Sequence, residues 1–198
     1  MRLICVGDSL TFGFGVRPLQ RWTHLCARQT GWSVSNEGVN GDTTGGMLAR
    51  LQRFLPELKA GGIGAEHPRV LLMGGSNDVF YSGTDTGARA NMGAMIHQVI
   101  GVGVLPIVGL PLPVDDAHTP EAWSAVVDFS AAASRMKEYC AWLRRYCVAF
   151  GVPYIDFYAD YVKKDGTVRG ELLLDGLHPT PEGHRLMAQR LSALLLEQ

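Results

Sequence analysis

The feature that most constrains this chain is the regular alternation of short, apolar, β-branched segments with longer segments of helical periodicity. Five segments have the length and composition of buried strands: Leu3–Val6, Ser33–Asn36, Val70–Met73, Leu105–Leu110 and Tyr154–Phe157. Helical patterns lie between and after them, at Arg21–Thr30, Thr44–Leu58, Gly87–Ile100, Ser124–Phe150 and Pro181–Leu196. Repeated strand–helix units are typical of a parallel sheet with helices on both faces. The sequence therefore predicts an α/β fold, a three-layer α/β/α sandwich around a five-stranded parallel sheet.

The length of 198 residues suits one domain with one sizeable core. No linker, repeat or low-complexity tract divides the chain, so we expect a single domain over residues 1–198. Two segments are predicted to be connections. Gly61–Gly64 is a glycine-rich loop after the second helix, and Asp165-Gly166 favours a tight turn within Lys163–Thr167.

Charge and cysteine content exclude several classes of function. A net charge of −1 gives no electrostatic case for binding nucleic acid or an anionic membrane. No apolar run is long enough to span a bilayer, and the chain as given begins with no secretory signal. The cysteines lack metal-like spacing, which favours reduced core thiols in a cytoplasmic protein; a leader removed before this sequence is the open alternative. They are Cys5, Cys26, Cys140 and Cys147.

Residues with useful chemistry follow the predicted strands. Ser9 follows the first strand, Gly41 the second and Asn77 the third, and Asp175 and His178 lie in the connection after the fifth. In an open parallel sheet, ligands bind outside the carboxyl ends of the strands. We therefore expect these groups to converge on one edge of the sheet.

The hydroxyl of Ser9 is a weak nucleophile unless a base lies beside it and a third group orients that base. His178 can accept the proton, and Asp175, three residues earlier, can fix the imidazole tautomer. The order Ser, Asp, His is that of α/β-hydrolases, but their G-x-S-x-G elbow is absent here. The sequence predicts Ser9 as nucleophile, His178 as base and Asp175 as orienting acid.

Each of these residues also has a purely structural interpretation. Ser9 could cap a helix, Gly41 could be only a turn glycine, and Asn77 could make an Asx turn after the third strand. The turn and a backbone donor are compatible at Gly41. Asp8 and Asp156 are expected to brace loops rather than act as catalytic acids.

The remaining histidines have no catalytic assignment; they are His24, His67, His97, His118 and His184. His118 follows the fourth strand and is either a pocket residue or a solvated loop histidine. Thr180 and Pro181 are a typical N-cap and first residue of the last helix.

Four blocks carry a resemblance to a known family: Gly7–Leu10, Asn36–Asp42, Gly74–Asp78 and Asp175–Pro179. In this order they resemble the SGNH, or GDSL, hydrolase superfamily over nearly the whole chain. The resemblance implies the flavodoxin-like strand order 2-1-3-4-5. It also implies an oxyanion hole formed by the N–H groups of Ser9 and Gly41 and the side-chain amide of Asn77. Neither a cofactor nor a metal ion is implied.

The sequence says less about which residues contact the substrate. Two loops should rim the site, Val79–Gly83 and Pro111–Asp115 with its continuation to Trp123, and the candidate contacts are Phe80, Tyr81, Leu112 and Val114. These side chains could equally be core residues. No insertion is long enough for a large lid, so we expect an open site.

The resemblance implies a serine esterase that forms an acyl-enzyme on Ser9, and short-to-medium acyl or aryl esters are the expected small-molecule substrates. An acyltransferase, a thioesterase or lysophospholipase, and a carbohydrate acetylesterase are alternatives on the same chemistry. A non-enzymatic flavodoxin-like binder is the alternative from another class. The sequence gives no indication of an oligomeric state.

Overall fold

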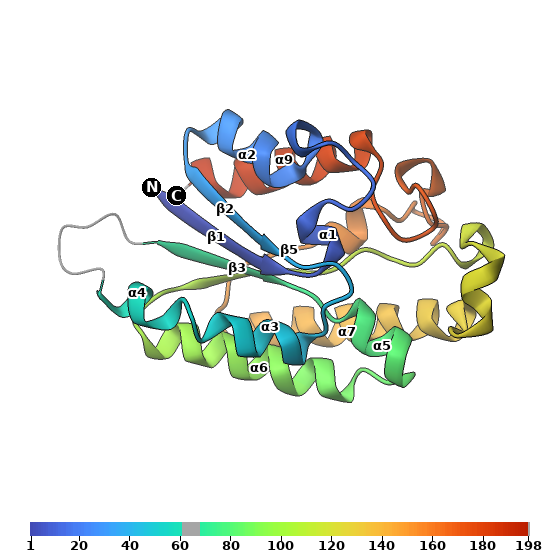
Figure 1. Cartoon of the computed structure of the whole chain (residues 1–198), viewed down its shortest axis with the longest axis horizontal. Coiled ribbons are helices and arrows are strands. Elements are labelled where there is room, and N and C mark those ends of the chain that lie inside the picture. Colours follow the sequence, from blue (N-terminus) through green and yellow to red (C-terminus); the bar gives the residue numbers. More distant parts are fainter. Residues whose placement is uncertain (61–67, 198) are drawn as a thin grey trace.

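The protein is built around a parallel sheet (Figure 1). The computed structural model describes residues 1–60 and 68–197, so the predicted loop at Gly61–Gly64 lies outside the described residues. The strands are β1 (Arg2–Gly7), β2 (Ser33–Gly38), β3 (Arg69–Met73), β4 (Pro106–Gly109) and β5 (Tyr154–Ile155). Their order is β2-β1-β3-β4-β5, and every neighbouring pair is parallel. The predicted strand order is confirmed.

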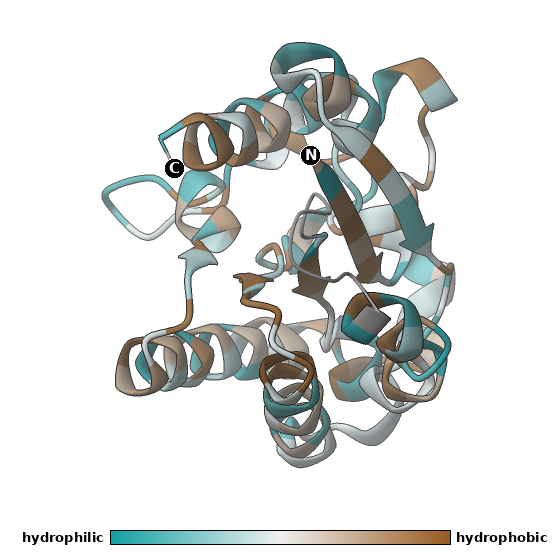
Figure 2. Ribbon diagram, turned by 90° about the vertical axis from the view of Figure 1, so that its left-hand side faces the viewer, coloured by the Kyte–Doolittle hydropathy of each residue, from teal (hydrophilic) through white to brown (hydrophobic). Residues whose placement is uncertain are grey.

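Helices cover both faces of the sheet, as Figures 1 and 2 show. One face carries α2 (Trp22–Thr30) and α9 (Pro181–Leu196), and the other carries α3 (Thr44–Leu51), α6 (Thr86–Gly101) and α7 (Phe129–Phe150). Shorter helices are α1 (Ser9–Phe12), α4 (Leu55–Ala60), α5 (Ser76–Ser82) and α8 (Phe157–Asp160). The described residues also include the 3-10 segments η1 (Pro18–Gln20), η2 (Asp116–His118), η3 (Glu121–Ala125) and η4 (Gly170–Leu172). The three-layer sandwich is confirmed.

The central strand β1 shows why both faces of the sheet are covered. Leu3 and Cys5 pack into the cluster under α2 and α9, whereas Ile4 and Val6 pack into the cluster under α3, α6 and α7. All four side chains are fully buried. Successive side chains of a strand point to opposite faces, so a continuous apolar run must be covered on both sides. Figure 2 shows this strand in the hydrophobic colour.

Two predicted helices have different bounds in the structure. The pattern at Thr44–Leu58 forms two helices, α3 and α4, because Pro56 has no N–H to donate and its ring clashes with the carbonyl four residues earlier. In the pattern at Ser124–Phe150, the first two residues end the 3-10 segment η3, and the α-helix begins only at Phe129. Asp128 starts α7 there, since its carboxylate accepts a hydrogen bond from the N–H of Ala131 at 2.9 Å.

Two further expectations are corrected where strands meet the site. The strand predicted at Tyr154–Phe157 ends at Ile155, because Asp156 caps α8 by accepting from the N–H of Ala159 at 2.9 Å. Asp156 also pairs with Arg144, so its predicted structural role is confirmed. Val79–Gly83 is not a loop, since Val79 to Ser82 belong to α5.

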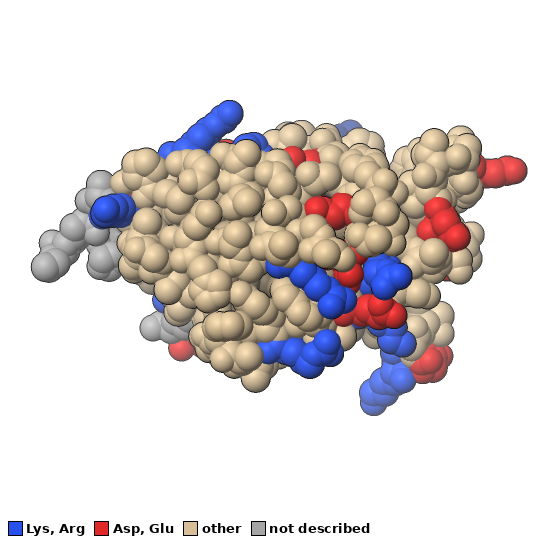
Figure 3. All heavy atoms as spheres, turned by 90° about the horizontal axis from the view of Figure 1, so that it is seen from below, with Lys and Arg blue, Asp and Glu red and all other residues tan. Residues whose placement is uncertain are grey.

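Other local expectations hold. Gly166 donates its N–H to the carbonyl of Lys163 at 2.9 Å, which closes the predicted turn. Thr180 caps α9 and Pro181 is its first residue. In the parts of the chain that the structure describes, no helix is both long and apolar enough to cross a membrane. On the face covered by α3 and α6, Figure 3 shows basic and acidic side chains beside one another rather than one large patch of a single sign.

Candidate active site

The structure brings Ser9, His178 and Asp175 together, although 169 positions separate the first two in the chain. Ser9 is the first residue of α1, and only Asp8 separates it from the end of β1. Its Oγ lies 3.0 Å from Nε2 of His178, and Nδ1 of the same ring lies 2.8 Å from Oδ2 of Asp175. This geometry allows proton transfer from the hydroxyl to an imidazole whose orientation a carboxylate fixes.

A tight turn holds the histidine and its carboxylate. Oδ1 of Asp175 accepts from the N–H groups of Leu177 at 3.1 Å and His178 at 2.9 Å. Gly176 has φ +76°, and a side chain there would meet the carbonyl oxygen of Asp115. The turn is anchored because the N–H of Asp115 donates to the carbonyl of Gly176 at 2.9 Å. The position therefore requires glycine.

The electrostatics of Asp175 suit a carboxylate that stays ionised. Burial raises the pKa of Asp175, but the hydrogen bonds from the His178 ring and from backbone N–H groups outweigh that effect, and the pKa lies below its ordinary value. An ionised carboxylate at this position is suited to stabilise a protonated imidazole beside it.

Asp8 is a buried structural carboxylate beside Ser9. It is fully buried and caps α1 by accepting from the N–H of Leu10 at 2.9 Å. The residue that caps this helix is therefore Asp8 and not Ser9. Burial raises the pKa of Asp8 to about 7, against the lowering effect of the hydrogen bond from Leu10 and of the nearby His178.

This raised pKa predicts a pH-dependent contribution of Asp8 to stability. The pKa rises from its ordinary value of 3.8 to about 7 on folding, so the folded state holds the proton more tightly. The contribution of Asp8 to the free energy of unfolding is therefore fully present below about pH 4, and it is lost as the pH rises towards about 7 and beyond. Asp8→Asn stays neutral at all these pH values. As the pH is raised from about 5 to about 8, we therefore expect the free energy of unfolding of this variant to increase by about 2 kcal/mol relative to that of the unchanged protein. Urea unfolding at both pH values measures this difference, and a difference that does not vary with pH contradicts the prediction.

The two further oxyanion candidates lie beside Ser9. Asn77 is in the first turn of α5, and its Nδ2 donates to the carbonyl of Asp42 at 2.8 Å, 35 positions away in the chain. An amide nitrogen has two hydrogens, so a second donor remains. Gly41 has φ +74°, which residues with a side chain rarely adopt, so it is a turn glycine, and it lines the same cavity as Ser9.

Hydrogen bonds between α3 and α5 hold the segments that carry Gly41 and Asn77 next to each other. Asp78 accepts from the N–H of Thr44 at 2.8 Å and from its hydroxyl at 2.6 Å. Thr44 begins α3 three residues after Gly41, and Asp78 follows Asn77. The Gly41 loop and the N-terminus of α5 are thus joined by these bonds and by the Asn77–Asp42 bond.

A cavity of about 340 Å³ opens over Ser9. Its polar lining consists of Ser9, Asn40, Gly41, Ser76, Asn77 and His178. Its apolar and aromatic lining consists of Leu10, Phe14, Phe80, Tyr81, Leu112, Pro113, Val114, Trp123, Val126, Val127, Phe129 and Leu177. Tyr81 and Val126 are largely exposed at the rim, so the cavity is open to solvent.

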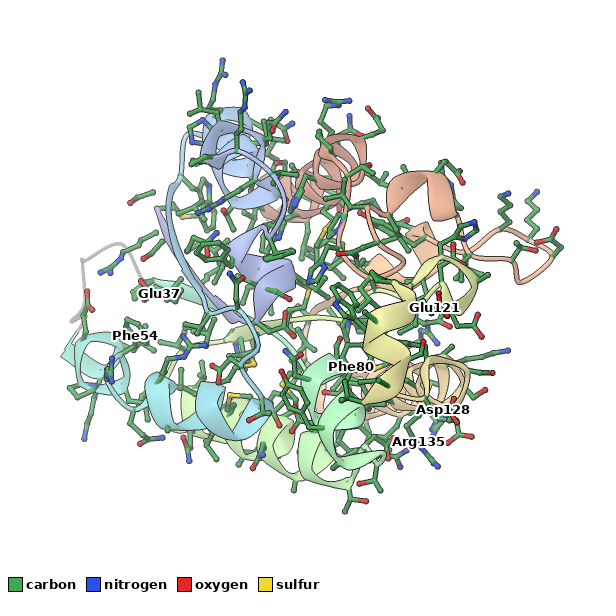
Figure 4. The ribbon with its side chains drawn as sticks, turned by 45° about the vertical axis from the view of Figure 1, so that its right-hand side comes forward. Glu37, Phe54, Phe80, Glu121, Asp128 and Arg135 are labelled. Carbon is green, nitrogen blue, oxygen red and sulfur yellow. The ribbon has the colours of Figure 1, made fainter. Side chains whose placement is uncertain are left out.

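All four predicted substrate contacts line this cavity. Leu112 and Val114 are nearly completely buried and belong to the core clusters, so their structural interpretation is confirmed, and their contact with substrate stays a prediction. Phe80 packs edge-on against Phe129, with 5.7 Å between ring centroids. Figure 4 shows Phe80 on α5, beside the η3 segment that carries Glu121.

Sequence reasoning missed several cavity residues, above all Phe14. The ring of Phe14 lies 4.6 Å from that of His178 and is 42% exposed. The available signal was an aromatic residue between Gly13 and Gly15 soon after the nucleophile. Phe129 was assigned only to a helix, because nothing local shows that its side chain reaches Phe80.

The other described histidines lie away from the Ser9 hydroxyl, and His67 lies outside the described residues. His118 is the largely exposed last residue of η2; it pairs with Asp115 at 2.9 Å and does not line the Ser9 cavity. Burial lowers the pKa of His184 to about 4, with smaller effects of Arg21 and His178. His97 bonds the hydroxyl of Tyr146 at 2.8 Å. His24 lies on α2.

Comparison with known proteins identifies the family. The profile of the GDSL-like lipase/acylhydrolase family matches residues 5–186. The chain belongs to this family. Esterase TesA of Pseudomonas aeruginosa is 27% identical over 185 residues, which cover 89% of this chain and 79% of that protein. This GDSL-like hydrolase is therefore a carboxylic ester hydrolase, an assignment that favours the enzyme over the flavodoxin-like binder.

Solved structures share the fold of this GDSL-like hydrolase. A GDSL-family lipolytic protein of Veillonella parvula has a TM-score of 0.80 at 22% identity, with all of both chains covered. The M. smegmatis aryl esterase has a TM-score of 0.78 at 21% identity, covering 99% of this chain and 98% of that one. Est24, a carbohydrate acetylesterase from Sinorhizobium meliloti, has a TM-score of 0.76 at 21% identity, covering 100% and 99%.

Proposed function

We propose that the protein is a serine esterase that hydrolyses short-to-medium acyl or aryl esters through an acyl-enzyme on Ser9. One observation carries this proposal. Hydrogen bonds connect Ser9 to His178 and His178 to Asp175, and the Ser9 end of this series lies in a cavity with a mainly apolar lining. A nucleophile, a base and an orienting carboxylate in this order are the parts that acyl transfer requires.

The proposed reaction has two halves. Oγ of Ser9 attacks the ester carbonyl carbon while Nε2 of His178 takes the hydroxyl proton, and the carbonyl oxygen becomes an oxyanion. The intermediate collapses to the acyl-enzyme as His178 gives its proton to the departing alcohol. Water then attacks the acyl-enzyme, with His178 again as base, and releases the acid and Ser9.

Three donors are proposed to stabilise the oxyanion: the N–H groups of Ser9 and Gly41 and the second amide hydrogen of Asn77. Their support is that Ser9, Gly41 and Asn77 line one cavity and that hydrogen bonds join Asn77 to the Gly41 loop. Donors that are already in place need no reorganisation when the negative charge develops.

The cavity walls support the substrate class. Phe80, Leu112 and Trp123 form an apolar surface beside Ser9, which suits a hydrocarbon acyl group. The leaving alcohol must lie near His178, which protonates it, and Phe14 packs on that ring. An aromatic alcohol could stack there.

A panel of p-nitrophenyl and alkyl esters of graded acyl length, with Ser9→Ala as the blank, tests this function. Hydrolysis that disappears in the blank supports it, and hydrolysis that persists contradicts it. Product analysis with an added alcohol separates hydrolysis from acyl transfer, because a transferase would form a new ester from the same intermediate.

The cavity walls also predict the acyl-length dependence. Each buried methylene contributes about 0.8 kcal/mol, a gain of a few-fold in kcat/KM, until the chain reaches the end of the cavity. We expect a maximum at short-to-medium length and a flattened maximum in Phe80→Ala, with activity on acetate esters as the internal control. Phe80 is a better probe than Leu112, whose truncation would also destabilise the core. A steady rise to long chains, unchanged in the variant, contradicts the prediction.

A cytoplasmic location is a further part of the proposal. All four cysteines are buried free thiols, which fits a reducing compartment. Fractionation of the source cells with detection of the protein tests this location.

A further inference from the structure

Arg50, near the end of α3, makes an unusual set of contacts behind the site. Its Nη1 donates to the carbonyl of Glu37 at 2.6 Å, and its Nη2 donates to the carbonyl of Gly7 at 2.9 Å. Nε and Nη2 also bind Oδ2 of Asp42, at 2.9 and 2.6 Å. The Arg50 and Asp42 side chains are only 18% and 14% exposed.

Two of these contacts lie within two residues of a proposed oxyanion donor, and the third lies on the strand that leads to the Gly41 loop. Gly7 is the last residue of β1, two positions before Ser9. Asp42 directly follows Gly41, and its main-chain carbonyl accepts the bond from Asn77. Glu37 lies near the end of β2, at the start of the loop that carries Gly41.

We infer that Arg50 is a positioning residue that fixes the three oxyanion donors relative to one another. The inference rests on the proposed function, because it concerns the same donors. Arg50 touches neither the cavity nor Ser9 in the structure and acts through the carbonyls and the carboxylate that it binds.

The contacts require an arginine rather than any cation. The planar guanidinium offers donors in fixed directions, so it can bind two carbonyls and a carboxylate at once. A lysine ammonium in its place is a single point of charge on a flexible stem and cannot span the same three acceptors. Arg50→Lys therefore keeps the positive charge but cannot make the hydrogen bonds to Gly7, Glu37 and Asp42 at the same time.

The test compares kcat, KM and the Ki of phenylboronic acid, which forms a tetrahedral adduct on a reactive serine. We expect Arg50→Lys to lower kcat and to raise this Ki by about tenfold each, with KM changed by less than about twofold. The loss is smaller than that for a deleted donor, because the donors remain but lose their alignment. Asp42→Asn, which keeps the backbone carbonyl bonded to Asn77, should change the same quantities in the same direction.

Arg144→Lys is the matched control. Arg144 binds Asp156 in the same two-nitrogen manner but lies away from the Ser9 cavity. We expect this variant to keep kcat and the Ki within about twofold of their original values. Melting temperatures of all variants separate positioning from general destabilisation.

Three results would overturn the inference: a folded Arg50→Lys protein with unchanged kcat, a rise in KM with unchanged kcat, or a fall in kcat without a change in Ki. If Arg50→Lys does not fold, Asp42→Asn decides by the same criteria. Labelling of the unchanged protein with a fluorophosphonate is run in parallel. A label on Ser9 together with an unaffected Arg50→Lys protein refutes this inference alone, whereas a label elsewhere refutes the proposed function.

Discussion

Replacing Ser9 by alanine is expected to lower kcat for ester hydrolysis by about 10⁴- to 10⁶-fold while leaving the fold intact. The hydroxyl of Ser9 is the group that the structure places at 3.0 Å from Nε2 of His178, so its removal leaves the base without a nucleophile to activate. The side chain loses a single oxygen at a site already next to a cavity, so little packing changes. Initial rates on a short-chain aryl ester measure the effect, with circular dichroism and the melting temperature as checks on folding.

Ser76 provides a control for this prediction. It is a nearly buried serine that lines the same cavity from the start of α5. Its hydroxyl is not the one paired with His178, so Ser76→Ala should retain activity. A fluorophosphonate should label Ser9, as located by mass spectrometry, and should leave Ser76 unmodified. An adduct on Ser76, or an active Ser9→Ala protein, would show that the nucleophile has been assigned to the wrong residue.

Replacing Asn77 by alanine is expected to lower kcat by about 10²- to 10³-fold, the usual effect of losing one oxyanion donor. KM should change much less, because the donor acts mainly on the charge that develops in the transition state. The variant also leaves the carbonyl of Asp42 without the bond from Asn77, which adds to the loss through the Gly41 loop. Steady-state kinetics on one ester over a range of concentrations separate the two parameters.

The matched control is Asn91→Ala. Asn91 lies on α6 and donates its amide to the Thr44 hydroxyl at 3.1 Å, so its removal also deletes an amide hydrogen bond near the start of α3. We expect this variant to keep kcat within about threefold. If Asn77→Ala has a kcat as high as that of Asn91→Ala, Asn77 is not an oxyanion donor and its role is purely structural.

Much of the fold was predictable because its signals are local. Leu3–Val6 and Val70–Met73 are short apolar runs that can be satisfied only where both faces of a sheet are covered. The N-cap Thr180 with Pro181, and the turn at Asp165-Gly166, depend on the backbone preferences of one or two residues. The strand order came from the resemblance carried by four short blocks, which the family match supports.

The predicted bounds of helices and strands were wrong where a single residue interrupted an otherwise regular pattern. Pro56 divides a segment whose apolar spacing fits one helix, and Asp128 starts α7 later than its periodicity suggests. Asp156 ends β5 early because its carboxylate caps the next helix. In each case one residue with a special backbone or capping preference outweighs a pattern that is spread over many residues.

The sequence by itself determined which residues are the candidates for catalysis, because Ser9, His178 and Asp175 are recognisable by type, order and spacing. Only the tertiary structure decided what surrounds them. The contact of Phe14 with His178, the wall formed by Phe80 and Phe129, and the bonds from Arg50 to Gly7 and Glu37 join residues far apart in the chain. Periodicity and capping act over a few residues, whereas these distances depend on how helices pack on the sheet, which no local pattern contains.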